Sequence, residues 1–127
     1  MILFYLSSFP IIRKQLWTAE VAMNVDALKK MLESGQDNLL LRFGLGQTLL
    51  KQGDSAEAIE HLQKAVEFDP QHSAAWKLLG KALAVENHQS DAINAYEQGI
   101  RVAEDKGDIQ AAKEMKVFLK RLQKDAD

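Results

Sequence analysis

Residues 74–100 read AAWKLLGKALAVENHQSDAINAYEQGI, and much of the architecture follows from this stretch. It holds two apolar stripes at helical spacing, separated by a polar turn at 86–90. A shift of 34 residues lays 39–67 over 73–101. The pairs that coincide are Leu45 and Leu79, Gly46 and Gly80, Leu49 and Leu83, Ala58 and Ala92, and Ile59 and Ile93. Such matches indicate a packing repeat, because neighbouring units constrain only the buried positions.

Each unit is predicted to form two helices joined by a short turn. In the first unit the pair Gly53-Asp54 interrupts the apolar stripe, as expected at a helix end. The pair Asp69-Pro70 closes the second helix, because the residue before a proline is disfavoured in the α region. Short polar side chains suit helix N-termini. We expect Asp54 or Ser55 to cap the second helix of the first unit, and Ser73 and Ser90 to cap the two helices of the second unit.

Two glycines, Gly46 and Gly80, stand inside predicted helices. A glycine at such a position costs about 0.5–1 kcal/mol relative to alanine. The expected compensation is close contact with a neighbouring helix, with the small residues Ala58 and Ala92 on the facing side.

Partial units flank the two repeats. The predicted domain covers residues 23–127, with a half-unit at 24–35, repeats at 39–72 and 73–106, and a capping helix at 109–124. We therefore expect an all-α solenoid of about six helices, whose last helix has a polar outer face. Its predicted inward residues are Ala112, Met115, Phe118, Leu119 and Leu122, and its basic face contains Lys113, Lys116, Lys120, Arg121 and Lys124.

The repeat resembles that of a known family. Its length and the string of Trp76, Leu79-Gly80, Leu83, Ala92 and Tyr96 are similar to the tetratricopeptide repeat (TPR). The resemblance covers most of the chain and implies a TPR-like α-solenoid of the small bacterial type. Arg42 stands where tryptophan is usual, and Glu104 where proline is usual. The missing proline suggests a longer, looser join before the final helix.

The resemblance also implies where a ligand would bind. In TPR arrays the first helix of each unit lines a concave groove that holds an extended peptide or a partner helix. The groove positions outside the core stripe are here Leu40, Phe43, Gln47, Leu50, Lys51, Lys77 and Lys81, with Ala74 and Ala84 beside the two lysines. Some TPRs clamp a C-terminal carboxylate, but Leu78 replaces an asparagine of that clamp, and Asp108 and Ala112 replace two basic residues. Chaperone tails are therefore not predicted ligands.

Two lysines of this groove favour an acidic partner. Lys77 and Lys81 are four residues apart on one helical face, and neither has an acid four residues away. Beside an exposed Phe43, unneutralised lysines would suit an acidic segment or a C-terminal carboxylate with an apolar side chain. The alternative is a solvated lysine pair, since charged side chains are mostly exposed.

No constellation for catalysis or cofactor binding is found in the sequence. There is no cysteine, and the three histidines lack the spacing of a metal site. Gly44-Leu45-Gly46 lacks the third glycine of a phosphate loop, and no strand is predicted before it. A net charge of −2 argues against a bulk nucleic-acid binder. We therefore expect no enzyme, no catalytic or metal-binding residue, no cofactor and no nucleic-acid partner.

Conspicuous side chains receive structural interpretations. We expect exposed positions for His61, His72, His88, Glu57 and Glu60, and packing between helices for Trp76 and Tyr96. The basic face of the capping helix could contact an acidic partner, RNA or anionic lipid. The favoured interpretation is a solubilising end surface, because the end of a repeat array needs a polar face.

The first dozen residues carry no charge, although charged residues make up 27% of the chain. This run is too short to span a membrane, which takes about 20 residues. As a signal peptide it lacks a basic start, since Arg13 and Lys14 follow the run. Residues 1–22 fit no half-unit of the repeat, and we expect an extension outside the fold, either disordered or absent from a protein that starts at Met23.

The sequence thus predicts a non-enzymatic, cytoplasmic module that binds a peptide segment or helix of a partner protein in its groove. Two alternatives stay open. One is a membrane-tethered assembly or secretion accessory anchored by the apolar N-terminus, although a membrane partner is disfavoured. The other is a self-associating scaffold, or homo-oligomer, since two full units only just supply an independent core.

Overall fold

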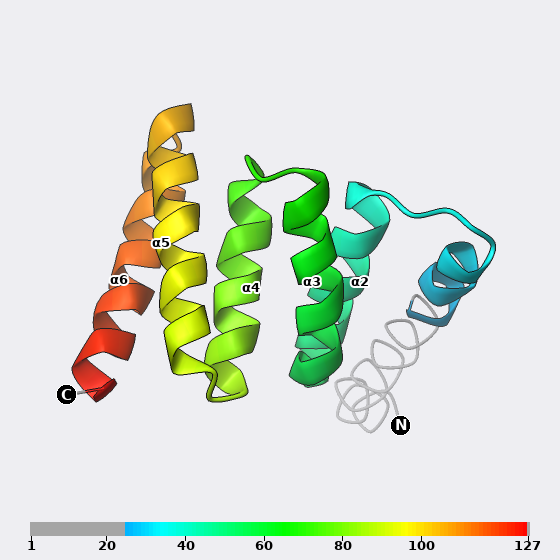
Figure 1. The fold of residues 1–127 in the computed structure, drawn as a ribbon, viewed down its shortest axis with the longest axis horizontal. Coiled ribbons are helices and arrows are strands. Elements are labelled where there is room, and N and C mark those ends of the chain that lie inside the picture. Colours follow the sequence, from blue (N-terminus) through cyan, green and yellow to red (C-terminus); the bar gives the residue numbers. More distant parts are fainter. Residues whose placement is uncertain (1–24, 127) are drawn as a thin grey trace, which may run out of the picture.

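A computed structural model describes residues 25–126. Six helices follow one another in this part of the chain. The first covers residues 25–33. After it come α2 (Leu39–Gln52), α3 (Ser55–Phe68), α4 (Ser73–Val85), α5 (Gln89–Lys106) and α6 (Ile109–Ala126). The helices lie side by side in a row, from the helix 25–33 at one end to α6 at the other (Figure 1). The predicted all-α repeat architecture is confirmed.

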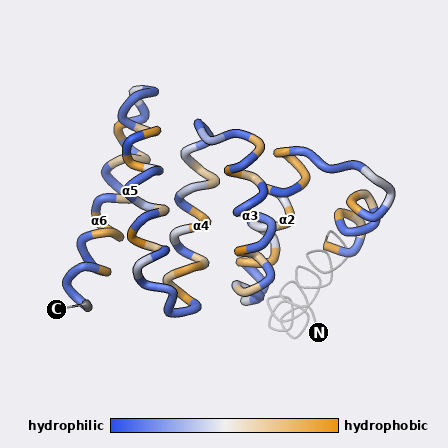
Figure 2. Tube along the Cα trace, viewed as in Figure 1, coloured by the Kyte–Doolittle hydropathy of each residue, from blue (hydrophilic) through white to orange (hydrophobic). Residues whose placement is uncertain are grey.

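Three helix ends form where the sequence supplies suitable residues. Gly53 ends α2 with a φ of 90°, in the left-handed region that favours glycine. At the equivalent point after α4, Asn87 has a φ of 61°, and asparagine also tolerates that conformation. Asp69 ends α3 in an extended conformation before Pro70, as predicted. Figure 2 shows hydrophilic residues in the turn between α4 and α5 and apolar residues recurring along the helices.

The prediction of helix caps is right for Asp54, the N-cap residue of α3, and wrong for the three serines. The serines lie one or two residues inside their helices, and the N-cap residues are Asp54, His72 and His88. His72 caps α4 through its side chain, because Nδ1 accepts a hydrogen bond from the N–H of Ala75 at 3.0 Å. Ser55 is buried, and its hydroxyl donates to the carboxylate of Glu86. Ser55 therefore links the start of α3 to the end of α4.

The join before the final helix is shorter than predicted. α5 continues to Lys106, so only Gly107 and Asp108 separate it from α6, whereas residues 69–72 separate α3 from α4. A proline would break the helix near Glu104. Without one, α5 gains about a turn and the chain reverses within two residues. α6 also ends two residues later than predicted, at Ala126.

Helices approach closely at Gly46 and Gly80, as predicted. A Cβ atom at Gly46 would lie 2.4 Å from the side chain of Leu62. One at Gly80 would lie 2.7 Å from the ring of Tyr96. The facing residues are thus large and not the predicted alanines, Ala58 and Ala92, although both alanines are buried nearby in the core. Each glycine makes room for the bulky side chain of the second helix.

The core continues under α6, as the spacing of its apolar residues predicts. Ala112 and Met115 are buried. The other predicted inward residues are half-buried against the core, namely Phe118, Leu119 and Leu122. The packing predicted for the two aromatic residues is also confirmed. Tyr96 is buried, and Trp76 is half-buried with its indole N–H donating to the carbonyl of Pro70 at 2.8 Å.

The predictions for residues 1–22 lie outside the described residues. Among residues 25–126, no helix is long and apolar enough to cross a membrane.

Candidate functional site

The first helices of the units form the inner layer of the row. α2 contacts α4, and α4 contacts α6. Within the described part of the chain, the second helices α3 and α5 do not contact each other. Because the first helices approach one another and the second helices do not, the row is concave on the side of α2, α4 and α6. The predicted groove lies on this side.

The α2 wall of the groove is partly apolar. Leu40 is 79% exposed, more than any other large hydrophobic residue described. Phe43 and Leu50 are half-buried and pack against the core. The ring centroid of Phe43 lies 4.9 Å from that of His72, so the exposed Phe43 that we expected is partly covered. The remaining two groove residues of α2 are exposed, Gln47 and Lys51.

The α4 wall carries the two lysines in different states. Lys77 Nζ lies 3.0 Å from a carboxylate oxygen of Glu114 on α6. The hydrogen bond from Lys77 lowers the pKa of Glu114, which keeps the pair charged. Lys81 is exposed and has no ion pair among the described residues. The prediction of two unneutralised lysines is therefore wrong for Lys77, whose partner comes from another helix.

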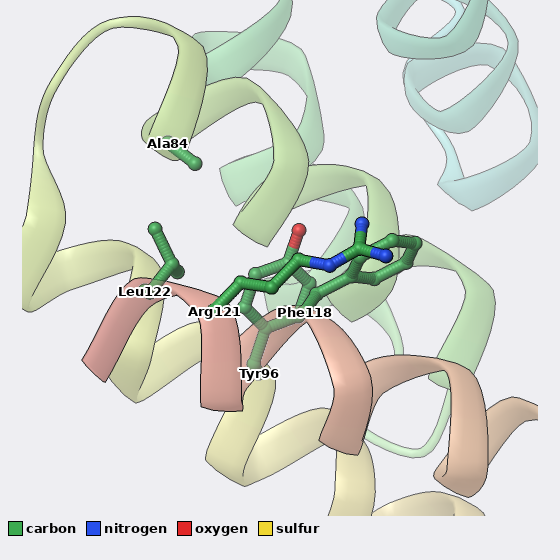
Figure 3. A pocket seen from close by; sticks show the side chains of 5 residues that line it. All are labelled: Ala84, Tyr96, Phe118, Arg121 and Leu122. Carbon is green, nitrogen blue, oxygen red and sulfur yellow. The ribbon is translucent and has the colours of Figure 1, made fainter. Parts of the chain in front are cut away.

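Beyond this ion pair, the seam between α4 and α6 opens into a small pocket (Figure 3). Its volume is about 160 Å³, and its lining residues are Ala84, Tyr96, Phe118, Arg121 and Leu122. Sequence reasoning placed Ala84 on the groove, Tyr96, Phe118 and Leu122 in the core, and Arg121 on the basic face, and it missed the hollow among them. A signal was present, because the apolar stripe of the last helix continues to Leu122, beyond the position equivalent to the end of α4.

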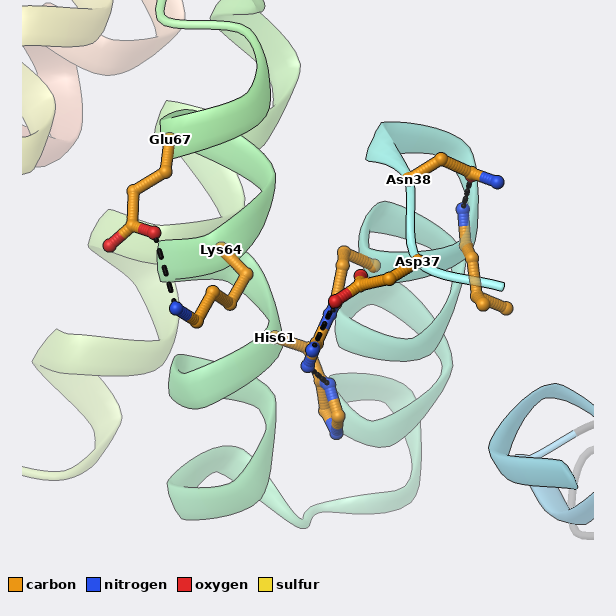
Figure 4. Close-up of polar contacts among 7 residues, drawn as sticks. Asp37, Asn38, His61, Lys64 and Glu67 are labelled. Atoms are coloured by element: carbon orange, nitrogen blue, oxygen red, sulfur yellow. Dashed lines mark hydrogen bonds and ion pairs between the residues drawn. The ribbon is translucent and has the colours of Figure 1, made fainter. Parts of the chain in front are cut away.

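A polar network that the sequence analysis missed joins α2 to α3. Arg42 donates from Nε and Nη2 to the carboxylate of Asp37 at 2.7 and 2.9 Å. Its Nη1 lies 3.0 Å from Nδ1 of His61 (Figure 4). Because arginine can only donate, Nδ1 of His61 accepts, and the proton of the neutral imidazole sits on Nε2.

The network has clear electrostatic consequences. Burial, followed by the charge of Arg42, lowers the pKa of His61. The hydrogen bond from Arg42 lowers the pKa of Asp37, and the same bond raises the pKa of Arg42. His61 is only 7% exposed, so the prediction of an exposed histidine is wrong there. It is also wrong in degree for His72, which is half-buried, and right for His88.

The 34-residue shift could have revealed this network. It aligns Arg42 with Trp76 and His61 with Ala95. One unit therefore fills the space between its helices with a polar pair, and the other with a large and a small apolar residue. We interpret the network as packing, since no group of side chains in residues 25–126 is placed to hold a metal ion.

The half-unit is attached to the first full unit by a salt bridge. Lys29 Nζ lies 2.7 Å from a carboxylate oxygen of Glu57. The hydrogen bond to Glu57 raises the pKa of Lys29. Glu57, which we expected on a solvated face, is half-buried and paired, whereas Glu60 is exposed as predicted.

Comparison with known proteins identifies the repeat. A family model described as "Tetratricopeptide repeat" matches residues 25–82 and 49–115. The TPR repeat-containing protein PA0015 of Pseudomonas aeruginosa is 53% identical over 100 residues, which are 79% of this chain and 95% of that protein. The solution structure of BPP2914 from Bordetella parapertussis is 42% identical, with a TM-score of 0.69, over 80% of this chain and 88% of that one.

More distant structures share the fold alone. The first TPR of Spaghetti (RPAP3) was solved bound to the HSP90 peptide SRMEEVD. It has a TM-score of 0.71 at 16% identity, and the match covers 90% of this chain and 86% of that one.

Proposed function

Because the chain belongs to the tetratricopeptide repeat family, we propose that it is a non-enzymatic module that binds a segment of another protein in its concave groove. TPR domains typically mediate protein–protein interactions. The observation that carries the proposal is that apolar side chains and an unpaired lysine lie on the same concave face. That face combines the exposed Leu40, the half-buried Phe43 and Leu50, and the exposed cation of Lys81.

The proposed binding mechanism combines apolar burial with charge selection. The partner segment lies along α2 and α4 and covers Leu40, Phe43 and Leu50, which removes apolar surface from water. Lys81 selects for an acidic segment or a C-terminal carboxylate. Lys77 contributes less to this selection than Lys81, because its ammonium group is already paired with the carboxylate of Glu114. The proposed contact residues are thus Leu40, Phe43, Gln47, Leu50, Lys51, Lys77 and Lys81.

Peptide binding by a distant relative supports the proposal. The Spaghetti domain holds an acidic HSP90 peptide on a fold of this type. The present chain differs from the carboxylate clamp at Leu78, Asp108 and Ala112. We therefore propose an acidic partner segment that is not a chaperone tail.

Affinity capture with matched variants tests this function. Lys81→Glu combined with Leu40→Glu reverses the charge and removes the apolar contact on the proposed face. Capture of the partner should fall about tenfold or more, since one hydrogen-bonded charge is worth about 1.5–3 kcal/mol. Lys64→Glu is the control, because Lys64 is an exposed lysine on the second helix α3. Unchanged capture by the double variant, at unchanged helical content, would show that the groove is not the binding surface.

A further inference from the structure

The pocket between α4, α5 and α6 has the size of one side chain. Its volume of about 160 Å³ is close to that of an engineered cavity, about 150 Å³, that binds benzene. Ala84 and Leu122 lie on one side of it, and Tyr96, Phe118 and Arg121 on the other (Figure 3). The centroids of the Tyr96 and Phe118 rings are 5.7 Å apart. One branched aliphatic or aromatic side chain would fill this apolar space.

Tyr96 offers the pocket an unused polar group. The residue is only 3% exposed, and its hydroxyl has no hydrogen-bond partner among residues 25–126. No polar side-chain atom in the described part is fully buried without a partner, so the Tyr96 oxygen keeps a small contact with solvent. Figure 3 shows this hydroxyl directed into the hollow. The hydroxyl is therefore within reach of a ligand and can donate a hydrogen bond to it.

Positive charge surrounds the opening. Arg121 lines this pocket and also a second one, together with Val117, Lys120 and Lys124. None of these three basic residues forms an ion pair within the described part of the chain. Two acidic residues of α6 lie along this face, Glu114, which is already paired with Lys77, and the exposed Asp125, four residues after Arg121. Neither forms an ion pair with Arg121 among the described residues, so a carboxylate brought to the opening would meet an unpaired guanidinium group.

We infer that this pocket binds one leucine, isoleucine, methionine or phenylalanine side chain of an acidic protein segment. A carboxylate next to that side chain pairs with Arg121, and a polar group of the ligand backbone hydrogen-bonds the Tyr96 hydroxyl. The inference rests on the proposed function, because Ala84 lies on the same face of α4 as Lys77 and Lys81. The inference adds which side chains of the partner segment bind at one end of the groove.

The observations favour a protein segment over RNA or a lipid surface. Single-stranded nucleic acid needs aromatic faces on which bases stack. Here Tyr96 is buried and Phe118 is half-buried beside it, inside a hollow that holds a single side chain. A membrane surface requires an outward apolar strip, whereas Val117 is the one exposed apolar residue among the four that line the second pocket.

Selection from a random peptide library displayed on phage tests the inference with the full chain. Wild type should enrich peptides in which Asp or Glu neighbours Leu, Ile, Met or Phe. Arg121→Glu reverses the charge at the opening, and Ala84→Trp fills the hollow. Each should weaken a selected peptide about tenfold or more. Lys113→Glu, an exposed lysine of the same helix outside both pockets, should leave the affinity unchanged.

Each other outcome would count against the pocket. Peptides that are weakened by Lys81→Glu and Leu40→Glu, but not by Arg121→Glu or Ala84→Trp, would leave the proposed groove standing and remove the pocket. Absence of enriched peptides, or binding only to phosphatidylglycerol vesicles or to a second copy of the chain, would overturn the inference. Circular dichroism of each variant confirms that a lost affinity is not a lost fold.

Discussion

At the scale of single residues, helical glycines set the distance between neighbouring helices. Gly46 admits Leu62 and Gly80 admits Tyr96. The positions of both glycines could be predicted from the repeat, because small residues recur where helices approach. Their partners could not, since the side chain that fills the space depends on how the two helices cross.

Alanine substitution should separate packing glycines from ordinary ones. Gly80→Ala places a Cβ 2.7 Å from the Tyr96 ring and should destabilise the protein by about 1–3 kcal/mol. Gly44→Ala is the matched control in α2, because its Cβ would lie 3.8 Å from Leu28, an ordinary contact. It should stabilise the protein by about 0.5–1 kcal/mol. Urea unfolding measures both, and equal effects of the same sign would refute the packing role of Gly80.

The buried histidine makes stability depend on pH. Burial and Arg42 lower the pKa of His61 in the folded state, whereas the unfolded value is about 6.5. The unfolded chain therefore takes up the proton more readily. The contribution of the neutral His61 is fully present above about pH 6.5 and is lost as the pH falls from there towards the folded pKa.

Unfolding free energies at about pH 7.5 and about pH 5.5 test this dependence. Wild type should lose stability at the lower pH. His61→Ala should show a smaller loss, because it removes the imidazole whose pKa is lowered in the folded state. His88→Ala, which removes an exposed histidine, should keep the wild-type dependence. The interpretation fails if His61→Ala and wild type lose the same amount.

At the scale of the helices, α6 is the element whose role differs most from its expected one. Its periodicity predicted the inward stripe, and Ala112 and Met115 are buried accordingly. Its basic face was interpreted as a solubilising end surface. The structure adds that α6 supplies the partner of Lys77 and one wall of a pocket. Periodicity within a single helix could not predict these features, because both depend on its position beside α4.

Met115 should be the most sensitive position of α6. It is fully buried, and its sulfur packs so closely on α5 that a Cβ added at Gly99 would lie 2.5 Å from it. Met115→Ala should cost about 2–5 kcal/mol in unfolding free energy. Val117→Ala, on the exposed side of the same helix, should change it by about 0.5 kcal/mol or less. Similar costs for the two variants would mean that α6 is not an integral part of the core.

At the scale of the whole molecule, the repeat predicted the row of helices and the side on which its groove lies. The residues of α2 and α4 that face that side could also be predicted. The pairing and exposure of the groove side chains could not be predicted, because Lys77 pairs with Glu114 from a distant part of the chain, and Phe43 is partly covered by His72 at the start of α4. Contacts between helices that are distant in the sequence decide which groove side chains are free to bind a partner. The residue pattern of a single unit does not reveal these contacts.

Chemical-shift mapping is the most direct test of the claim that the concave face binds a partner segment. The full chain, labelled with ¹⁵N, is titrated with a peptide from the captured partner or the phage selection. The largest amide shifts should fall on α2, α4 and α6, around Leu40, Lys81 and Arg121. Shifts concentrated on the solvent faces of α3 and α5, with these three helices unchanged, would contradict the claim.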